Sequence, residues 1–285
     1  MWPLADHGAA AVAVPCFAGS PFAAIPVHFS DPSSERSGPV TAVAATMADA
    51  YGSIFSQRGL SYDRAMRSQP QVRRHEFLQL FRNAPPQPHD VVLDIPSLGN
   101  YLGWYEPRFQ TVIPLDFAAS FRPEVRTVSP YGDWDLPATV TRVVCLAALH
   151  HLADLDGFLS NLIRQTGRGV LVHLADVDRS SRISGFLDDF VGRHTSTGHY
   201  GHYRDWEHYA PPAGLIRREV CTLPCPWSFL DRSAAAGFTR LLFGLERGSD
   251  AELLAALETM VGLRQDAAGG ITIDWELTYV DLVRV

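Results

Sequence analysis

Short apolar runs alternate with longer amphipathic stretches through the middle of the chain. Each run ends at polar, glycine or proline positions, as buried strands of a parallel sheet do. The four runs are 90–95, 109–116, 141–147 and 169–177. A helical pattern over 154–166 leads into the last run and ends near Gly167. Strands that alternate with helices in this way predict an α/β fold with a mostly parallel sheet.

Helical patterns also flank this central region. Residues 44–82 have apolar groups at spacings of three and four, and a group of prolines follows them. The same spacing predicts helices over 179–194 and 250–263. The closing stretch, 270–285, alternates well enough to be a long edge strand or an antiparallel strand.

The point at which the helical pattern begins suggests the domain organisation. Residues 1–43 are rich in Ala, Pro, Ser and Gly without a sustained period, so we expect an N-terminal extension there. The rest, 44–285, is predicted to be one domain with a helical N-terminal cover. Within it, 178–212 contains an aromatic, histidine-rich stretch that we interpret as a lid over the site.

Composition narrows the classes of function. Hydrophobic residues make up 46% and charged residues 19%, a soluble globular profile. All 24 basic residues are arginine, so lysine chemistry is excluded, and the net charge of -7 disfavours a nucleic-acid partner. Four cysteines do not indicate a disulfide scaffold. We expect no membrane span and no secretory signal, and therefore a cytoplasmic protein.

Several motifs stand in a consistent order over residues 60–178. The first strand ends at Asp94 in "VVLDIPSLGNYL" and the second ends at Asp116, where an acid can accept from ribose hydroxyls. "GDWDLP" (132–137), the "LHHL" step and an Arg-x-x-Gly-x-Gly turn follow. Together these segments resemble the class I S-adenosylmethionine (SAM)-dependent methyltransferases, in which "GDWDLP" is similar to the adenine-binding turn. The resemblance implies a Rossmann-like class I methyltransferase sheet, mostly parallel with a C-terminal antiparallel strand, and SAM as cofactor.

The turn after the first strand departs from the family pattern. Pro96, Leu98 and Asn100 stand where glycines are usual, and only Gly99 remains. Leu98 should occupy space near the methionine part of the cofactor, and Pro96 lacks a backbone donor. We therefore expect a rebuilt turn. The cofactor-binding residues that the resemblance implies are Asp94, Pro96, Ser97, Gly99, Asp116, Phe117, Asp133, Trp134 and Leu146.

In this fold the substrate lies at the carboxyl ends of the strands, over the cofactor. Methyl transfer to nitrogen or oxygen needs positioning and a base, and histidine is suited to proton transfer near neutral pH. The predicted catalytic residues are His151, His194, His199 and Tyr203. A metal site made from His194, His199 and His202 is the weaker interpretation because the spacing is no known ligand pattern, so we assign no metal.

The resulting hypothesis is a SAM-dependent methyltransferase that acts on a small organic molecule, in secondary metabolism. The aromatic lid favours a small-molecule partner, and a homodimer stays open. Two alternatives remain. One is a SAM-fold enzyme with non-methylating chemistry, such as cyclisation or elimination. The other is a non-catalytic binding protein.

Overall fold

The computed structural model describes residues 50–105, 109–119, 122–136, 139–199 and 201–285. They all belong to one compact unit, Ala45–Val285. The extension expected over 1–43 lies outside the described residues. In the described part of the chain, no helix is both long enough and apolar enough to cross a membrane.

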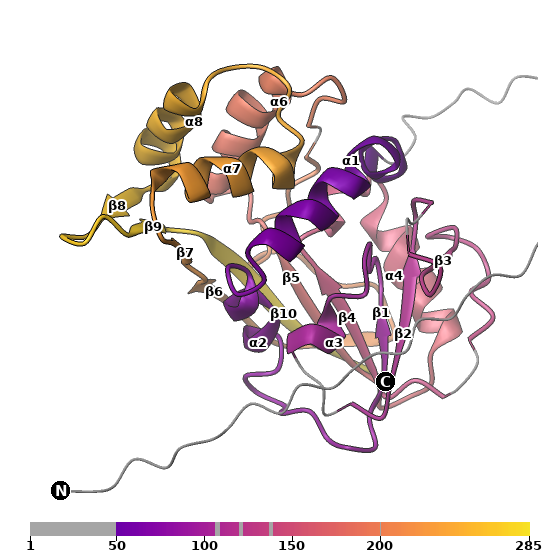
Figure 1. Cartoon of the computed structure of the whole chain (residues 1–285). Coiled ribbons are helices and arrows are strands. Elements are labelled where there is room, and N and C mark those ends of the chain that lie inside the picture. The colour runs from indigo at the N-terminus through magenta and orange to yellow at the C-terminus, as the bar shows by residue number, and fades with distance from the viewer. Residues whose placement is uncertain (1–49, 106–108, 120–121, 137–138, 200) are drawn as a thin grey trace, which may run out of the picture. The chain divides into compact units, whose positions relative to one another are not determined.

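The main sheet of the described residues has seven strands in the order β3-β2-β1-β4-β5-β10-β6 (Figure 1). Strands β3, β2, β1, β4 and β5 are parallel neighbours, and β10 is antiparallel to both β5 and β6. The predicted Rossmann-like sheet, mostly parallel with a C-terminal antiparallel strand, is thus confirmed. The strands are β1 (Val91–Asp94), β2 (Thr111–Asp116), β3 (Arg126–Thr127), β4 (Arg142–Leu146), β5 (Leu171–Asp176), β6 (Leu215–Pro224) and β10 (Glu276–Arg284).

The C-terminal strand β10 lies inside the sheet. It is antiparallel, as predicted, but the alternative of an edge strand is wrong, because β6 pairs with its outer side. Residues 277–283 of β10 are buried at every position, which shows that both faces of the strand are covered. The edge position belongs to β6, most of whose residues are exposed or half-buried.

Helices cover the sheet and extend beyond it. The helices are α1 (Ala50–Ser68), α2 (Arg74–Gln79), α3 (Leu102–Tyr105), α4 (Leu155–Gln165), α5 (Arg182–Gly185), α6 (Gly192–His194), α7 (Arg232–Phe243) and α8 (Asp250–Ala256). A 3₁₀ turn spans Leu149–His151, and π-helical turns span Phe186–Val191 and Leu257–Val261. With α5 and α6, the first π turn forms one helical segment inside the predicted range 179–194.

A small antiparallel sheet adjoins α7 and α8 and was not predicted from the sequence. Its strands are β7 (Trp227–Phe229), β9 (Ile271–Ile273) and β8 (Leu263–Gln265). Helix α7 begins where the Asp231 side chain accepts from the Ala234 amide, and it ends at Gly244 with a φ of 61°. Figure 1 shows α7 lying alongside α1.

Helix α1 lies at the end of the sheet where the parallel strands terminate (Figure 1). Its residues Tyr51, Ile54 and Phe55 form a small apolar cluster with Leu98 and with Ala118 and Ala148. Those last three residues belong to the turns after β1, β2 and β4. The N-terminal helix therefore covers the edge at which this fold class places its ligands.

Candidate active site

Two buried carboxylates end the neighbouring strands β1 and β2. Asp116 is satisfied within the protein: its Oδ2 accepts from the Tyr51 hydroxyl at 2.8 Å and from the Leu98 amide, and its Oδ1 accepts from the Ala118 amide at 2.7 Å. Asp94 Oδ2 accepts from the Ser97 hydroxyl at 2.7 Å. Both carboxylates are thus held in place at the carboxyl edge of the sheet.

Burial makes the ionised form of both acids costly. Loss of solvent raises the pKa of Asp94 to about 7, and the nearby Asp116 charge adds to this although the Ser97 hydrogen bond opposes it. Burial also raises the pKa of Asp116 to about 6, against the hydrogen bonds from Ala118 and Tyr51. A bound cation would favour the ionised forms of both groups.

The turn after β1 keeps a glycine-like backbone path without the usual glycines. Leu98 has a φ of 51° and Asn100 a φ of 55°, both in the left-handed region. The Leu98 side chain is buried against Tyr51 and its neighbours on α1. At Gly99, an added Cβ would come within 2.3 Å of the Tyr101 ring, so this position is closely packed.

A cavity of about 40 Å³ lies beside this turn, and we call it the cofactor cavity. Its lining includes four of the predicted cofactor-binding residues, Asp94, Pro96, Ser97 and Leu146. Phe117 is not among its lining residues, but its ring centroid lies 5.6 Å from that of Tyr51, which lines the cavity.

Asp133 and Trp134 are not part of the lining of the cofactor cavity. The Trp134 side chain is fully buried in the second core cluster, and its Nε1 donates to the Ser129 carbonyl at 2.9 Å. Asp133 is exposed and accepts from Gln165. The structure thus places the two predicted adenine contacts apart from Asp94, and their role stays a prediction.

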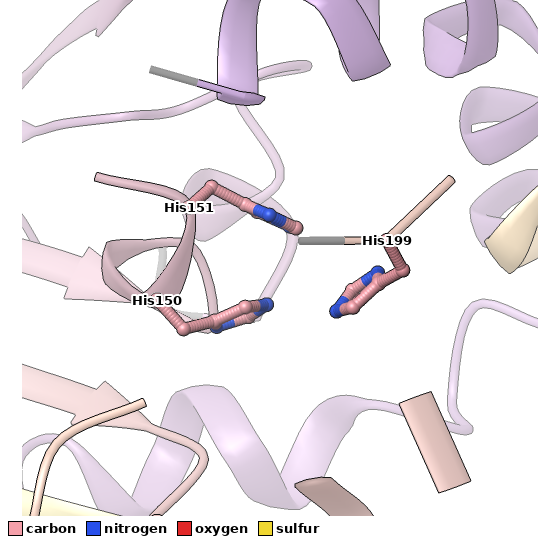
Figure 2. Close-up of side chains that lie close together, drawn as sticks. All are labelled: His150, His151 and His199. Atoms are coloured by element: carbon pink, nitrogen blue, oxygen red, sulfur yellow. The ribbon is translucent and has the colours of Figure 1, made fainter. Parts of the chain in front are cut away.

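Three buried histidines face one another beside the 3₁₀ turn that follows β4 (Figure 2). Ring centroids lie 4.1 Å apart for His150 and His151, 5.4 Å for His150 and His199, and 4.9 Å for His151 and His199. One nitrogen from each ring lies within 4.8 Å of the others, so this group has the donor set for a metal ion. We call it the histidine cluster.

The tautomer of His150 follows from its partner. His150 Nδ1 lies 2.5 Å from Asp176 Oδ1 at the end of β5. Because a carboxylate only accepts, Nδ1 carries the proton, and Nε2 presents its lone pair. His150 and Asp176 therefore form a pair that can accept a proton at Nε2.

Three of the four predicted catalytic residues come together here. His151 and His199 belong to the histidine cluster, and the Tyr203 ring stacks on His150 with centroids 5.4 Å apart. Tyr203 donates to Asp188 at 3.2 Å, and its burial and Asp188 raise the pKa of its hydroxyl. Burial lowers the pKa of His199 well below its usual value, and the positive charge of Arg58 lowers it further.

His194 does not join this group. It ends α6, its ring stacks on Phe190 with centroids 4.0 Å apart, and its Nδ1 lies 2.7 Å from the Phe190 carbonyl oxygen. Its backbone carbonyl accepts from the amides of Glu246 and Arg247. In the structure it joins α6 to the loop after α7.

A second cavity, of about 50 Å³, lies against the histidine cluster, and we call it the acceptor cavity. Its lining combines the three histidines with Arg58 and Arg73 and with aromatic side chains. Phe55, Tyr62 and Ala147 line both cavities, so the two adjoin. The aromatic side chains of the acceptor cavity are Phe55, Tyr62, Trp227, Phe243 and Trp275.

Arg58 is a site residue that the sequence did not reveal. Its side chain is 6% exposed, although it stands in a polar stretch of an amphipathic helix. The burial comes from α7: a Cβ added at Gly244 would lie 2.8 Å from Arg58 Cγ. Burial lowers the pKa of Arg58 to about 10, so the guanidinium stays charged at neutral pH.

No protein-family model matches the chain, and no curated protein matches it in sequence. Several solved structures are similar in fold. The YcgJ protein of Bacillus subtilis is 14% identical over 74% of this chain and 98% of its own, with a TM-score of 0.48. A putative methyltransferase of Bacillus halodurans is 15% identical over 73% and 98%, with a TM-score of 0.47.

A geranyl diphosphate C-methyltransferase of Streptomyces coelicolor, in complex with Mg²⁺, geranyl diphosphate and S-adenosyl-L-homocysteine, is 12% identical. The similarity covers 79% of this chain and 84% of that one, with a TM-score of 0.45. Similarities this distant concern the fold and transfer neither a substrate nor a reaction.

Proposed function

We propose that the chain is a SAM-dependent methyltransferase that acts on a small organic molecule. The observation that carries this proposal is the pair of adjoining cavities at the carboxyl edge of the sheet. One is lined by Asp94 and by Tyr51 and Leu98, which both donate to Asp116, and the other contains the histidine cluster. A methyl donor and its acceptor must meet in line, and neighbouring cavities allow that.

The residues of the cofactor cavity fit the groups of SAM. Asp116 presents a carboxylate for ribose hydroxyls, and the Tyr51 hydroxyl now makes the hydrogen bond that a ribose hydroxyl would make. Asp94 and Asp116 favour a ligand with ammonium and sulfonium charges, because each acid is destabilised by burial. The cofactor would supply the methyl group on its sulfonium.

SAM can bind only if helix α1 moves away from the cofactor cavity. A cavity of about 40 Å³ is far below the roughly 300 Å³ or more of a ligand pocket. Tyr51 must release Asp116, and Leu98 must turn from the site or redirect the methionine end. We propose that α1 acts as a movable cover.

For the proton acceptor we propose His150, oriented by Asp176. The sequence prediction named its neighbour His151. We favour His150 because the 2.5 Å contact with Asp176 leaves its Nε2 lone pair available in the acceptor cavity. A positioned base of this kind contributes about 10²- to 10⁴-fold to the rate. The aromatic lining supports a small, ring-containing acceptor. A role in secondary metabolism is part of the proposal.

Calorimetric titration with SAM and S-adenosylhomocysteine, followed by mass analysis of products, tests the proposal. We expect binding of both ligands and formation of S-adenosylhomocysteine with an acceptor. Release of methylthioadenosine would favour non-methylating chemistry. Absence of binding at millimolar SAM would refute the proposal and leave a binding protein that does not use this cofactor.

A further inference from the structure

The acceptor cavity contains one positive charge without a counter-charge. Arg58 forms no salt bridge with any described residue, and its Nε and Nη1 have no hydrogen-bond partner there. Its nearest aromatic contact is Phe55, with the ring centroid 6.0 Å from Cζ. By contrast, Arg73 in the same lining donates to the Glu76 carboxylate at 2.8 Å, and Asp176 is held by His150.

An unpaired buried charge destabilises a protein, so its presence in a cavity indicates a ligand that compensates it. A second side chain in the lining also lacks a hydrogen-bond partner. His199 is 6% exposed, and neither of its ring nitrogens has a partner among the described residues. One anion that accepts from the guanidinium and from the imidazole N–H would give both side chains a hydrogen-bond partner.

The alternative ligand, a divalent metal ion on the histidine cluster, fits this charge balance poorly. The ion would add two positive charges beside a guanidinium that already lacks a partner, and Arg58 is close enough to affect the charge on His199. A monoanion instead gives Arg58 the direct counter-charge that no described residue supplies. Electrostatics therefore favours the anion over the metal.

We propose that the acceptor cavity binds a small aromatic carboxylate, with its carboxylate on Arg58 and His199. Because about 50 Å³ is too small for an aromatic ring, side chains of the lining must move apart to admit it. The planar guanidinium matches a carboxylate with two parallel hydrogen bonds. The stacked indoles of Trp227 and Trp275, with centroids 4.1 Å apart, form the apolar wall for the ring. A doubly charged phosphate would leave a buried negative charge, so we choose the carboxylate.

That this carboxylate is the methyl acceptor rests on the function proposed above, but its binding does not. Calorimetry and thermal melting of the full chain without SAM separate the two claims. The probes are phenylacetate, its neutral counterpart phenylacetamide, and phenyl phosphate. We expect phenylacetate to bind and to raise the melting temperature, with the other two at least tenfold weaker. Equal binding of the amide would overturn the proposal.

Variants locate the site. Arg58→Met should weaken phenylacetate at least tenfold while the ligand-free melting temperature holds or rises, because the unpaired charge is gone. Arg58→Lys keeps the charge without the two-pronged geometry and should retain an intermediate affinity. Arg64→Met is the matched control, since Arg64 is an exposed arginine of the same helix. Neither the affinity for phenylacetate nor the melting temperature should change in this variant. Unchanged affinity in Arg58→Met would refute the assignment.

Metal analysis and SAM titration separate the remaining outcomes. A stoichiometric transition metal in the purified chain that is lost in His199→Phe would assign the cluster to a metal and overturn the anion proposal. A chain that binds phenylacetate but not SAM keeps the carboxylate site and refutes the methyltransferase. A chain that binds SAM but not phenylacetate keeps the methyltransferase proposal and refutes the carboxylate site.

Discussion

Leu98 combines an unfavourable backbone conformation with a buried side chain. Its φ of 51° costs about 1 kcal/mol for an L-residue, whereas its burial contributes about 2 kcal/mol. Leu98→Gly should therefore lower the free energy of unfolding by about 1 kcal/mol, and Leu98→Ala should lower it further, because alanine keeps the backbone strain. Urea unfolding of both variants measures this. A glycine variant less stable than the alanine variant would contradict the reasoning.

The same substitution bears on the cofactor. Removing the Leu98 side chain frees space beside Asp94, so Leu98→Gly should bind SAM at least as tightly as the natural chain. Titration calorimetry at one pH gives the comparison. A loss of binding in this variant would mean that the cofactor, if any, lies elsewhere.

Tyr51 and Asp116 make opposite predictions for affinity. Asp116→Ala removes the carboxylate proposed for the ribose and should weaken SAM tenfold or more. Tyr51→Phe removes the hydroxyl that competes for Asp116 and should tighten SAM several-fold, at a stability loss of about 1 kcal/mol. SAM dissociation constants for the two variants test the pair. Equal effects of the same sign would argue against competition at Asp116.

At the scale of elements, the sequence was most informative where a segment is apolar throughout. Strands β1, β4 and β5 lie within the predicted runs because both their faces are buried. Strand β2 also lies within its run, although its first two residues are exposed or half-buried. The two-residue β3 is too short to leave a pattern. The position of β10 between β5 and β6 could not be predicted from the sequence either, because the alternation of apolar residues along a strand does not reveal which strands pair with it.

The site was predictable only in its local parts. Asp94 and Asp116 follow their strands directly, so their closeness comes from the strand pairing that the fold class implies. The burial of Arg58 depends instead on packing between α1 and α7, where the Ser61 hydroxyl donates to the Leu241 carbonyl at 2.6 Å. No local pattern predicts a contact between segments so far apart in the chain.

That contact gives a prediction for two glycines of the α7 region. Gly244→Ala places a Cβ at a φ of 61° and 2.8 Å from Arg58 Cγ, so it should lower the free energy of unfolding by about 1–2 kcal/mol and shift Arg58. At Gly237, inside α7, an added Cβ meets nothing within 4 Å, and Gly237→Ala should stabilise by up to about 1 kcal/mol. Denaturant midpoints compare them, and equal effects would contradict the packing argument.

At the scale of the whole molecule, the two cavities favour ligands of opposite charge. Asp94 in the lining of one cavity, with Asp116 near it, favours a cation, and the unpaired Arg58 of the other favours an anion. The shared wall of Phe55, Tyr62 and Ala147 keeps these charges in neighbouring but distinct spaces. A sulfonium donor and a carboxylate acceptor would each complete the charge balance of one cavity, which links the two proposals through physical chemistry.

The buried acids also predict how stability depends on pH. The pKa values of about 7 for Asp94 and about 6 for Asp116 lie above the unfolded value near about 3.9, so the folded chain binds more protons between those limits. The free energy of unfolding should therefore fall as pH rises from about 4 to about 7, by up to about 1.4 kcal/mol per pH unit and group, and should level off above pH 7. In the ligand-free Asp94→Asn variant, the free energy of unfolding should depend less on pH. SAM should act oppositely, binding more tightly as pH rises through 7, because the ionised acids attract its positive charges. Urea unfolding and SAM titration at pH 5, 6, 7 and 8 test both trends, and a stability that rises across this range in the natural chain but not in Asp94→Asn would refute the assignment.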